Sequence, residues 1–417
     1  MSGIRVNEWL HNSGTGGIWQ TAAGNVGIAS SVPTTKLEVT GDAKISGVTT
    51  ATTFIQSEGQ LSNRNLVING AMNVAQRGTS DSGASGGMTC DRFGVYPSGA
   101  DEAPTQSQHS LTTSDTGPYE AGFRNSLHVQ NGNQTSGAGT ADNCRILYKI
   151  EAQDLANSGW NYKSATSYLT LSFWVKSSVA QNFYMQIRTL DGTGQSYPME
   201  TGSLTADTWT KVTKTIPGLA SGNIDVNDDS GAGMEINWWQ FLGTDSTGSV
   251  SLDTWAAYSG STRTPNQTST WWTTNDATFE LTGVQIEVGQ KDTPFEHEPH
   301  SQTLNKCLRY YEQFNSNGLT EAVFCSGYFE SDTNGRVCLN YYQKRGQPTL
   351  TFSAASTWTC LNTNNIPAAS AIATQKVTET AALITVTLPS VTDGNGRSCI
   401  LCSVSATEAT ILVDAEI

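Results

Sequence analysis

The segment from Asp225 to Gly231 carries oxygen-bearing side chains at alternate positions, as the ligands of a calcium-binding loop do. Asp225, Asn227 and Asp229 would supply the ligands, so a bound calcium ion is one hypothesis for this segment. The glycine comes one place late for such a loop, however, and Glu235 falls short of the position that provides a bidentate carboxylate. We therefore favour a solvated turn here, and we expect no other cofactor.

Tryptophan is concentrated in the middle of the chain, where eight of the 11 tryptophans lie between residues 160 and 272. An exposed tryptophan ring beside amide and carboxylate side chains can stack on the apolar face of a sugar. Neighbours in a strand point to opposite faces, so only one of Trp238 and Trp239 should lie in the core, and the same holds for Trp271 and Trp272 if that pair is in a strand. Burial in a core or interface is still the favoured interpretation of any single tryptophan, and Trp174 is expected in the core. The candidates for a glycan contact are Trp238, Trp239, Trp255, Trp271 and Trp272.

Three motifs match catalytic or metal-binding patterns only formally. Residues 83–87 (GASGG) fit the serine-hydrolase elbow, but polar loop flanks them where a strand and a helix are required. His297 and His300 are spaced as metal ligands on a helix, yet the proline between them favours an extended link. Cys399 and Cys402 have redox spacing without the helix that follows a thioredoxin site, so we interpret them as buried strand residues facing opposite ways. We expect the chain not to be an enzyme.

The composition excludes two further classes of function. The 417 residues carry 23 lysines and arginines against 37 aspartates and glutamates, which gives a net charge of -14. Such a chain lacks the positive charge that holds nucleic-acid phosphates. No apolar run approaches the roughly 18 residues of a membrane helix, and the N-terminus shows no signal-peptide segment. We expect neither nucleic-acid binding nor membrane insertion, and the eight scattered cysteines fit folding in a reducing cytosol.

Short strand-like segments separated by Gly, Ser, Asp, Asn and Pro clusters dominate residues 63–299, and a two-sheet sandwich is the architecture they favour. Only 14% of the residues are charged, which is typical of a turn-rich all-β protein with Ser, Thr, Asn and Gly on its surface. The predicted strands are Asn65–Asn69, Arg145–Glu151, Leu169–Lys176, Asn182–Arg188, Thr210–Thr215, Glu235–Phe241 and Phe279–Val288.

The first 62 residues are poor in large apolar side chains, yet they show a strand-like alternation. Leu37 and Val39 precede a turn at Gly41-Asp42, and Ala43 and Ile45 follow it, which predicts a two-stranded ribbon. A ribbon this small is marginal alone, because it buries too little apolar area to offset the entropy of ordering. Identical copies would have to supply the missing face, although a disordered leader is the alternative. The regular alternation favours the ordered oligomer.

The spacing of apolar residues changes from strand-like to helical after Pro299. Ser301 is the expected N-cap of an amphipathic helix, whose stripe of Leu304, Cys307, Leu308 and Tyr311 runs on to about residue 314. From about residue 320 the pattern is again typical of strands. An Asn334-Gly335 turn is predicted between strands at 324–330 and 337–342, and later strands at 382–388, 398–405 and 410–413. This region favours a second, smaller sandwich.

Several segments together resemble a β-sandwich module of bacteriophage tail-fibre and receptor-binding proteins. They are Asn65–Thr79 (NLVINGAMNVAQRGT), Asp91–Phe93 (DRF), Leu171–Lys176 (LSFWVK), Leu281–Gly289 (LTGVQIEVG), Thr293–Glu296 (TPFE), Cys307–Glu312 (CLRYYE) and Val413–Ile417 (VDAEI). Three leader segments are similar to shaft segments of trimeric fibres, particularly those of marine phages: Gly24–Ile28 (GNVGI), Lys36–Gly47 (KLEVTGDAKISG) and Thr50–Phe54 (TATTF). The terminal Ile417 departs from the more usual leucine, and the leader is short for a fibre.

The resemblance implies an all-β chain in four parts: an intertwined N-terminal β segment that is both virion-attachment leader and trimeric shaft (1–62), a jelly-roll carbohydrate-binding-like module (63–299), a short linking helix (300–318) and a smaller C-terminal β-sandwich (319–417). Such a protein would be a structural tail fibre of the virion, made in the host cytoplasm. It would assemble as a homotrimer, join phage tail or adaptor proteins through its N-terminus and bind a host surface glycan or protein. The candidate residues for virion attachment are Ile4, Val6, Trp9, Leu10 and Trp19.

Two other functions stay open at the level of sequence. A tail-borne enzyme that degrades polysaccharide would need clustered carboxylates, and the chain shows no β-helix repeats to host such a cleft. A purely structural appendage or decoration protein of the virion would have the same strands but no receptor. Adsorption that depends on salt or divalent ions would fit a receptor role, because the net charge of -14 repels an acidic surface unless it is screened.

Overall fold

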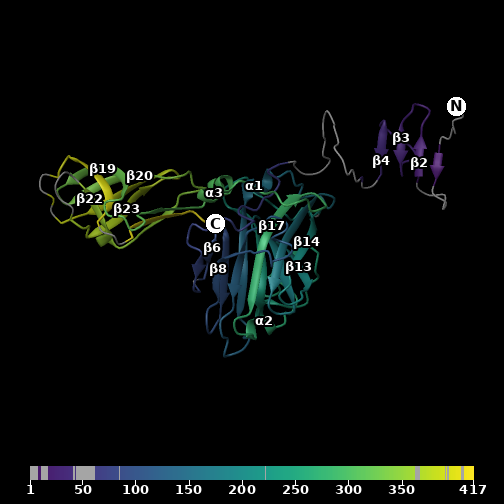
Figure 1. Ribbon diagram of the computed structural model, residues 1–417, viewed down its shortest axis with the longest axis horizontal. Coiled ribbons are helices and arrows are strands. Elements are labelled where there is room, and N and C mark those ends of the chain that lie inside the picture. Colours follow the sequence, from purple (N-terminus) through teal and green to yellow (C-terminus); the bar gives the residue numbers. More distant parts are fainter. Residues whose placement is uncertain are drawn as a thin grey trace. The chain divides into compact units, whose positions relative to one another are not determined.

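The structure is a computed structural model that describes residues 8–10, 17–40, 43, 62–83, 85–220, 222–361, 367–389, 391, 394–404 and 408–417. The chain divides into two compact units, Met1–Gln56 and Ser57–Ile417, and strands dominate both (Figure 1). The predicted all-β class is confirmed. Among the described residues, no helix is both long enough and apolar enough to traverse a lipid bilayer.

The N-terminal unit is a four-stranded sheet of β1 (Glu8–Leu10), β2 (Gly17–Gln20), β3 (Val26–Ile28) and β4 (Leu37–Val39). The predicted strand at Leu37 is present, but it pairs in parallel with β3. The predicted return strand through Ile45 lies outside the described residues. Apolar side chains of this unit are left uncovered, because Ile18, Ile28 and Leu37 are 45%, 41% and 62% exposed.

The larger unit begins with a two-sheet sandwich. Its seven-stranded sheet runs in the order β16 (Ala256–Ala257), β13 (Gln195–Ser203), β12 (Asn182–Thr189), β15 (Ala232–Leu242), β10 (Asn143–Glu151), β7 (Phe93–Ser98) and β6 (Gly87–Cys90). Its six-stranded sheet runs in the order β14 (Thr210–Pro217), β11 (Tyr168–Ser177), β17 (Thr278–Val288), β9 (Asn125–Gln130), β8 (Thr105–Ser110) and β5 (Ser80–Asp81). Short helical segments at α1 (Ala152–Ala156), η1 (Thr244–Ser246) and α2 (Thr270–Thr273) join strands.

Alternation along the strands decides what the sandwich buries. On β15, Met234, Ile236 and Trp238 enter the apolar core between the sheets, so the residues between them face away from it. On β11, Phe173 lies in this core, whereas Trp174 is half-buried over a satellite cluster that contains Phe123. The prediction that Trp174 is a core residue is therefore wrong, because alternation places it on the outer side of its sheet.

Irregular backbone explains where the predicted strands fail. The segment 65–69 is not a strand, because the Asn65 side chain accepts hydrogen bonds from the backbone N–H groups of Val67 and Ile286, and the chain turns at Asn69 with φ of 62°. The side chain of asparagine commonly replaces backbone partners in this way. Opposite this segment, Gly283 has φ of 62° at a register shift between β11 and β17. A side chain there would collide with the ring of Phe123.

The linking helix α3 (His300–Leu308) is shorter than predicted. Pro299 is its N-cap, so Ser301 lies within the first turn, and Tyr311 belongs to the strand β18 (Tyr311–Asn315). Strand β18 pairs with β26, and the carboxyl-terminal half of the predicted helix is therefore held as a sheet. Tertiary pairing overrides the helical spacing of the sequence here.

The C-terminal sandwich combines a three-stranded and a six-stranded sheet. Their orders are β18, β26 (Thr410–Asp414), β21 (Thr349–Phe352), and β22 (Trp358–Leu361), β25 (Ser398–Ser403), β19 (Val323–Ser331), β20 (Asn334–Asn340), β24 (Ala381–Thr387), β23 (Ala371–Val377). The helical turn η2 (Ala355–Thr357) precedes β22. The predicted hairpin of β19 and β20 is present, but its turn is at 332–333, since Asn334 already pairs with Ser331. The C-terminal sandwich has its own buried core, which contains Phe329 and Trp358.

Candidate functional site

The face of the seven-stranded sheet that points away from the core carries polar and aromatic side chains in rows. Register aligns Tyr184 of β12, Trp239 of β15 and Arg145 of β10 across the sheet, and Tyr96 of β7 continues the row. The strands stay in register, so two further rows lie beside this one: Gln186, Asn237 and Leu147 form the next, and Arg188, Glu235 and Lys149 the one after it. We call these outward residues the outer polar face: Tyr96, Arg145, Leu147, Lys149, Tyr184, Gln186, Arg188, Glu235, Asn237 and Trp239.

Trp239 is the centre of this face, and arginines cover its ring. The guanidinium carbon of Arg145 lies 5.1 Å from the ring centroid, and that of Arg263, from the segment after β16, lies 5.6 Å away. Cations over an indole face are attracted by its quadrupole. Trp238 and Trp239 therefore point to opposite sides of the sheet as predicted, but both are only 1% exposed.

The segment after β16 lies against the outer polar face and contacts it through a few polar groups. The Arg188 guanidinium carbon lies 3.7 Å from the centroid of Tyr258, and its Nη1 lies 3.6 Å from the Glu235 carboxylate. The backbone carbonyl of Arg263 accepts a hydrogen bond of 3.2 Å from the amide of Gln186. These contacts hold the segment against the outer polar face.

Polar atoms without a hydrogen-bond partner gather at this face. Of twelve such buried side-chain atoms in the described part of the chain, five belong to this face or to Arg263 above it, and Gln240 Oε1 follows Trp239 directly in β15. The five are the Nε atoms of Arg145, Arg188 and Arg263, Asn237 Oδ1 and Trp239 Nε1. A buried polar atom left without any partner costs about 1–3 kcal/mol, so such atoms take water or a ligand as partner. A ligand rich in hydroxyl groups or anionic oxygens suits them.

The charge at the face is opposite to that of the whole chain. Within the described residues, Arg145 and Arg263 form no ion pair with a carboxylate, whereas Arg188 is near Glu235. Burial lowers the pKa of Arg145, and the nearby Glu235 carboxylate opposes that effect. The guanidinium groups of Arg145 and Arg263 both lie near the ring of Trp239. Two such groups close together are suited to bind an anionic oxygen.

The structure corrects the predicted tryptophan platform. Trp271 and Trp272 lie in α2 and are fully buried, since Trp272 stacks on Phe241 with centroids 5.3 Å apart. Trp238 belongs to the sandwich core, and Trp255 is half-buried with its Nε1 donating to a backbone carbonyl at 2.6 Å. Four of the five rings are therefore buried, by apolar packing or, for Trp239, beneath arginines, whereas the half-buried Trp255 stays a candidate.

The three candidate calcium ligands are directed to separate protein partners. Asp225 accepts from Lys163 at 3.2 Å, and Asp229 accepts from a backbone N–H two residues on, at 2.8 Å. Asn227 donates its amide to Asp191 at 2.9 Å. These contacts fit the favoured solvated turn, and the calcium hypothesis stays a prediction.

The other predicted sites are partly described. Ile4 and Val6 lie outside the described residues, as do the side chains of Trp9 and Leu10, although these two belong to β1. Trp19 is half-buried on β2. The attachment hypothesis for these five residues stays a prediction.

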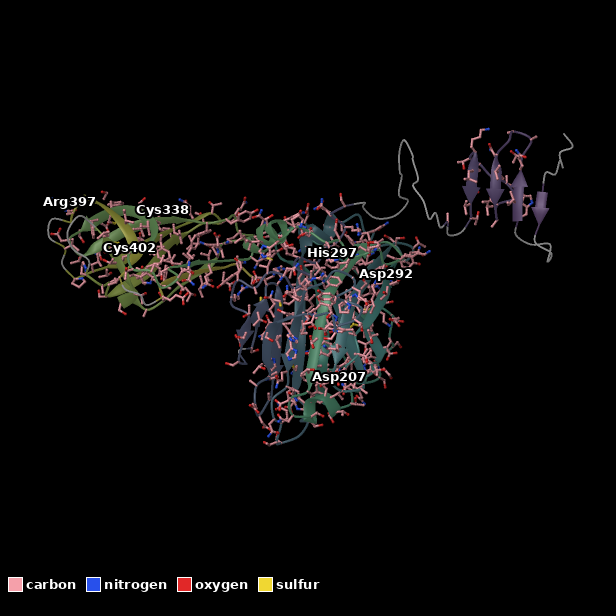
Figure 2. All side chains as sticks on the ribbon, viewed as in Figure 1. Asp207, Asp292, His297, Cys338, Arg397 and Cys402 are labelled. Carbon is pink, nitrogen blue, oxygen red and sulfur yellow. The ribbon has the colours of Figure 1, made fainter. Side chains whose placement is uncertain are left out.

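The formal catalytic motifs have structural explanations. Gly87, the last residue of the serine-hydrolase pattern, is the first residue of the strand β6, so a strand stands where the elbow requires a helix. The Nε2 of His297 is 2.9 Å from a backbone carbonyl in the sandwich. Cys399 and Cys402 are both buried in β25, as predicted, and Figure 2 shows Cys402 within the C-terminal sandwich.

A hollow of about 730 Å³ lies between α3 and the two sandwiches, lined by residues such as Asp154 and Tyr310. Three of its cations form ion pairs within the protein, and Arg345 donates to three backbone carbonyls. The pairs are Lys306 with Glu298, Arg309 with Glu151 and Lys344 with Glu312. This hollow therefore offers less to a ligand than the outer polar face does.

The arginines of the outer polar face are not among the residues predicted from the sequence, because no motif contains them. A signal was present in β15, where Glu235, Asn237 and Trp239 alternate with apolar residues. The arginines come from different strands and from a loop, so only the register of the sheet brings them together.

No protein-family model matches the chain, and no curated protein is similar to it in sequence. Among solved structures, it is similar to the enzymatically active domain of tailspike protein 4 of bacteriophage CBA120, with 12% identity, 54% of this chain and 21% of that chain covered, and a TM-score of 0.26. The chain thus spans about a fifth of that tailspike domain. It is also similar to the family 11 carbohydrate-binding module of a Clostridium thermocellum cellulase, with 13% identity, 48% and 90% covered, and a TM-score of 0.24. A third match is the N-terminal cellulose-binding domain of Cellulomonas fimi β-1,4-glucanase C, with 12% identity, 53% and 99% covered, and a TM-score of 0.25.

Proposed function

We propose that this chain is a tail fibre of a phage virion that binds an anionic host-surface glycan through the outer polar face of its first sandwich. Its function is binding rather than catalysis. The observation that carries the proposal is the set of buried polar atoms without a protein partner around Trp239, beneath two arginines that have no carboxylate partner among the described residues.

The chemistry of the face selects the class of ligand. Arginine binds carboxylate, sulfate and phosphate groups with paired hydrogen bonds, so a saccharide with one of these groups would be preferred over a neutral one. Half-buried Tyr96, Tyr184 and Tyr258 surround the arginines and can contact the apolar face of a sugar ring. Because Arg145 and Arg263 are free of ion pairs to described carboxylates, their side chains can turn to a ligand without breaking one.

The leader supplies the assembly in this proposal. Its small sheet leaves Ile18, Ile28 and Leu37 exposed, which supports the hypothesis that three copies cover one another's apolar side chains. A homotrimer would present three weak sites together, and avidity could then exceed the affinity of each site by about 10²–10⁴-fold. The N-terminal end would join the fibre to the phage tail.

A saccharide array probed with the intact chain tests this function. We expect binding to isolated acidic saccharides to weaken as salt increases, because salt screens their ion pairs with the arginines of the face; the repulsion by the net charge of -14 concerns a whole acidic cell surface. The double variant Arg145→Gln/Arg263→Gln should lose about tenfold or more of the signal. Arg336→Gln removes one positive charge from β20 of the other sandwich and is the matched control, which should bind like the wild type. Equal binding by the double variant, or a preference for neutral saccharides only, would refute the proposed site.

A further inference from the structure

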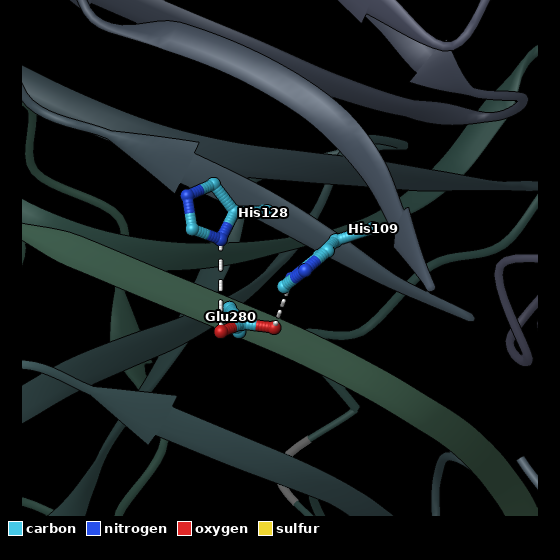
Figure 3. A group of neighbouring side chains, drawn as sticks. All are labelled: His109, His128 and Glu280. Carbon is cyan, nitrogen blue, oxygen red and sulfur yellow. Dashed lines mark hydrogen bonds and ion pairs between the residues drawn. The ribbon is translucent and has the colours of Figure 1, made fainter. Parts of the chain in front are cut away.

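Two histidines and a glutamate meet on the outer side of the six-stranded sheet. His109 lies on β8, His128 on β9 and Glu280 on β17, and Figure 3 shows both imidazole rings directed at the two carboxylate oxygens. Register explains the meeting, because His128 pairs directly with Glu280. His109 pairs with Ser126 in the neighbouring row, and Ser126 Oγ donates to the same carboxylate at 2.7 Å.

The geometry of this cluster is close to that of a metal centre. His109 Nδ1 lies 3.3 Å from Glu280 Oε2, and His128 Nδ1 lies 3.6 Å from Glu280 Oε1. The ligand atoms of the three side chains all lie within 4.8 Å of one another. At bond lengths of about 2.0–2.2 Å, neighbouring ligands of a tetrahedral zinc ion lie about 3.3–3.5 Å apart. Closing the cluster around an ion therefore requires small side-chain movements.

A second observation also points to a ligand. The Nδ1 atom of His128 is buried and has no hydrogen-bond partner among the described residues. It faces the carboxylate across a distance that is too long for a hydrogen bond but that a metal ion would bridge. The side chains of Glu280 and His128 are 4% and 19% exposed, whereas that of His109 is 50% exposed, so an ion could enter past His109.

We propose that His109, His128 and Glu280 bind a divalent transition-metal ion of the zinc class. Imidazole nitrogens with one carboxylate suit zinc, whereas calcium and magnesium prefer oxygen ligands throughout. Three protein ligands leave a fourth position for water or for an oxygen of a bound molecule. The ion would also tie β8, β9 and β17 together, and it would stabilise the folded chain because it binds that state.

Lys176 on β11 is the competitor for this site. Its Nζ lies 2.9 Å from Glu280 Oε1 and 3.1 Å from Asp115 Oδ1. An ammonium group this close to Glu280 Oε1 would repel a cation bound at the same oxygen, so metal binding requires Lys176 to move away from Glu280. When an ion binds, Lys176 can keep Asp115 as its partner, and Trp209 Nε1 still donates to Asp115 at 3.0 Å.

The test is calorimetric titration of the intact, tag-free chain with zinc, together with the visible absorption of cobalt in its place. We expect one ion per chain and the absorption of a tetrahedral cobalt centre. Glu280→Gln and His109→Asn should each weaken binding about tenfold or more, because loss of even an outer-shell partner of a ligand costs about 10–100-fold in metal affinity. Lys176→Met should tighten it, because a positive charge beside the ion is removed. His300→Ala, which removes an exposed histidine of α3, should change nothing.

His109→Asn keeps the result decisive if the buried Glu280 variant fails to fold, since His109 is half-exposed. The proposal is overturned if the wild type binds no zinc at one per chain. It is equally overturned if His109→Asn binds zinc as tightly as His300→Ala does. Because these readouts use metal alone, they are independent of whether the chain binds a glycan.

Discussion

The buried guanidinium of Arg92 forms an ion pair with Glu416, the penultimate residue of the chain. Arg92 lies in the turn between β6 and β7, donates to the Lys149 carbonyl at 2.7 Å, and is stacked 3.4 Å from the ring centroid of Tyr310. Arg345 holds the same tail through the carbonyl of Glu416 at 2.7 Å. The tail that follows β26 of the C-terminal sandwich is therefore fastened to the first sandwich by buried charge.

Replacing Glu416 should destabilise the chain strongly. Glu416→Gln leaves the Arg92 guanidinium buried without its counter-ion, and breaking a buried pair in this way costs about 3–5 kcal/mol. We expect a melting temperature several degrees lower by differential scanning calorimetry. Glu120→Gln is the matched control, because Glu120 is exposed on the first sandwich, to which Arg92 also belongs. If both variants melt at the wild-type temperature, the tail contributes nothing to holding the sandwiches.

Acid should weaken a second junction of α3 with the first sandwich. Arg309 donates from Nε and Nη2 to the buried carboxylate of Glu151, at 2.8 Å each. Burial alone raises the pKa of Glu151, but the hydrogen bonds from Arg309 outweigh it and hold that pKa below its ordinary value of 4.5. A carboxyl whose pKa is lower in the folded than in the unfolded chain stabilises above its ordinary pKa and loses that effect as pH falls.

Glu151→Gln should therefore make the melting temperature depend less on pH in the acid range. The variant should be less stable than the wild type at pH 6, and the difference in melting temperature should shrink between pH 5 and pH 3. Calorimetry of both proteins over this range measures it. A constant difference across the range would mean that the Glu151 carboxylate does not titrate with a lowered pKa.

Cysteine reactivity should single out Cys338. It is exposed on β20, where Figure 2 shows it on the C-terminal sandwich, while Cys90 and Cys144 are fully buried. Cys325 is half-buried, and burial raises its pKa to about 12, which disfavours the reactive thiolate. Mass spectrometry after brief maleimide treatment should find one label per native chain and none in Cys338→Ser. Rapid labelling of several sites would contradict the packing of these strands.

The trimer hypothesis predicts a particle three times the 44.5 kDa of one chain by multi-angle light scattering. Ile18→Asn/Leu37→Asn should dissociate it, because both side chains are exposed in the leader sheet and would form the contacts between copies. Leu319→Asn, which changes an apolar residue 63% exposed in the other unit, should leave the trimer intact. A monomeric wild type would remove the shaft hypothesis.

The sequence was sufficient for much of the fold and for little of the site. Long apolar alternation identified β10, β11, β15 and β17, because each strand buries one face against the facing sheet. It failed at residues 65–69 and at Tyr311, where side-chain hydrogen bonds and pairing with β26 decide the backbone. The motifs at 91–93 and 413–417 lie far apart in the sequence, and only the fold joins them, through Arg92 and Glu416.

Sites were harder to predict, because they depend on register between distant strands. His109 and Glu280 lie 171 residues apart and meet only across β9. The tryptophans predicted as glycan contacts serve mainly to fill the core, whereas Arg145 and Arg263 are not among the predicted site residues. Neither arginine belongs to a motif, so no spacing could reveal their approach to Trp239.

The central claim is tested most directly by a crystal structure of the intact chain soaked with the acidic saccharide that binds best on the array. We predict the sugar over β10 and β15, with its anionic group in ion-pair distance of Arg145 and Arg263 and its ring against the neighbouring tyrosines. A saccharide bound at any other surface, with both arginines unchanged, would contradict the account.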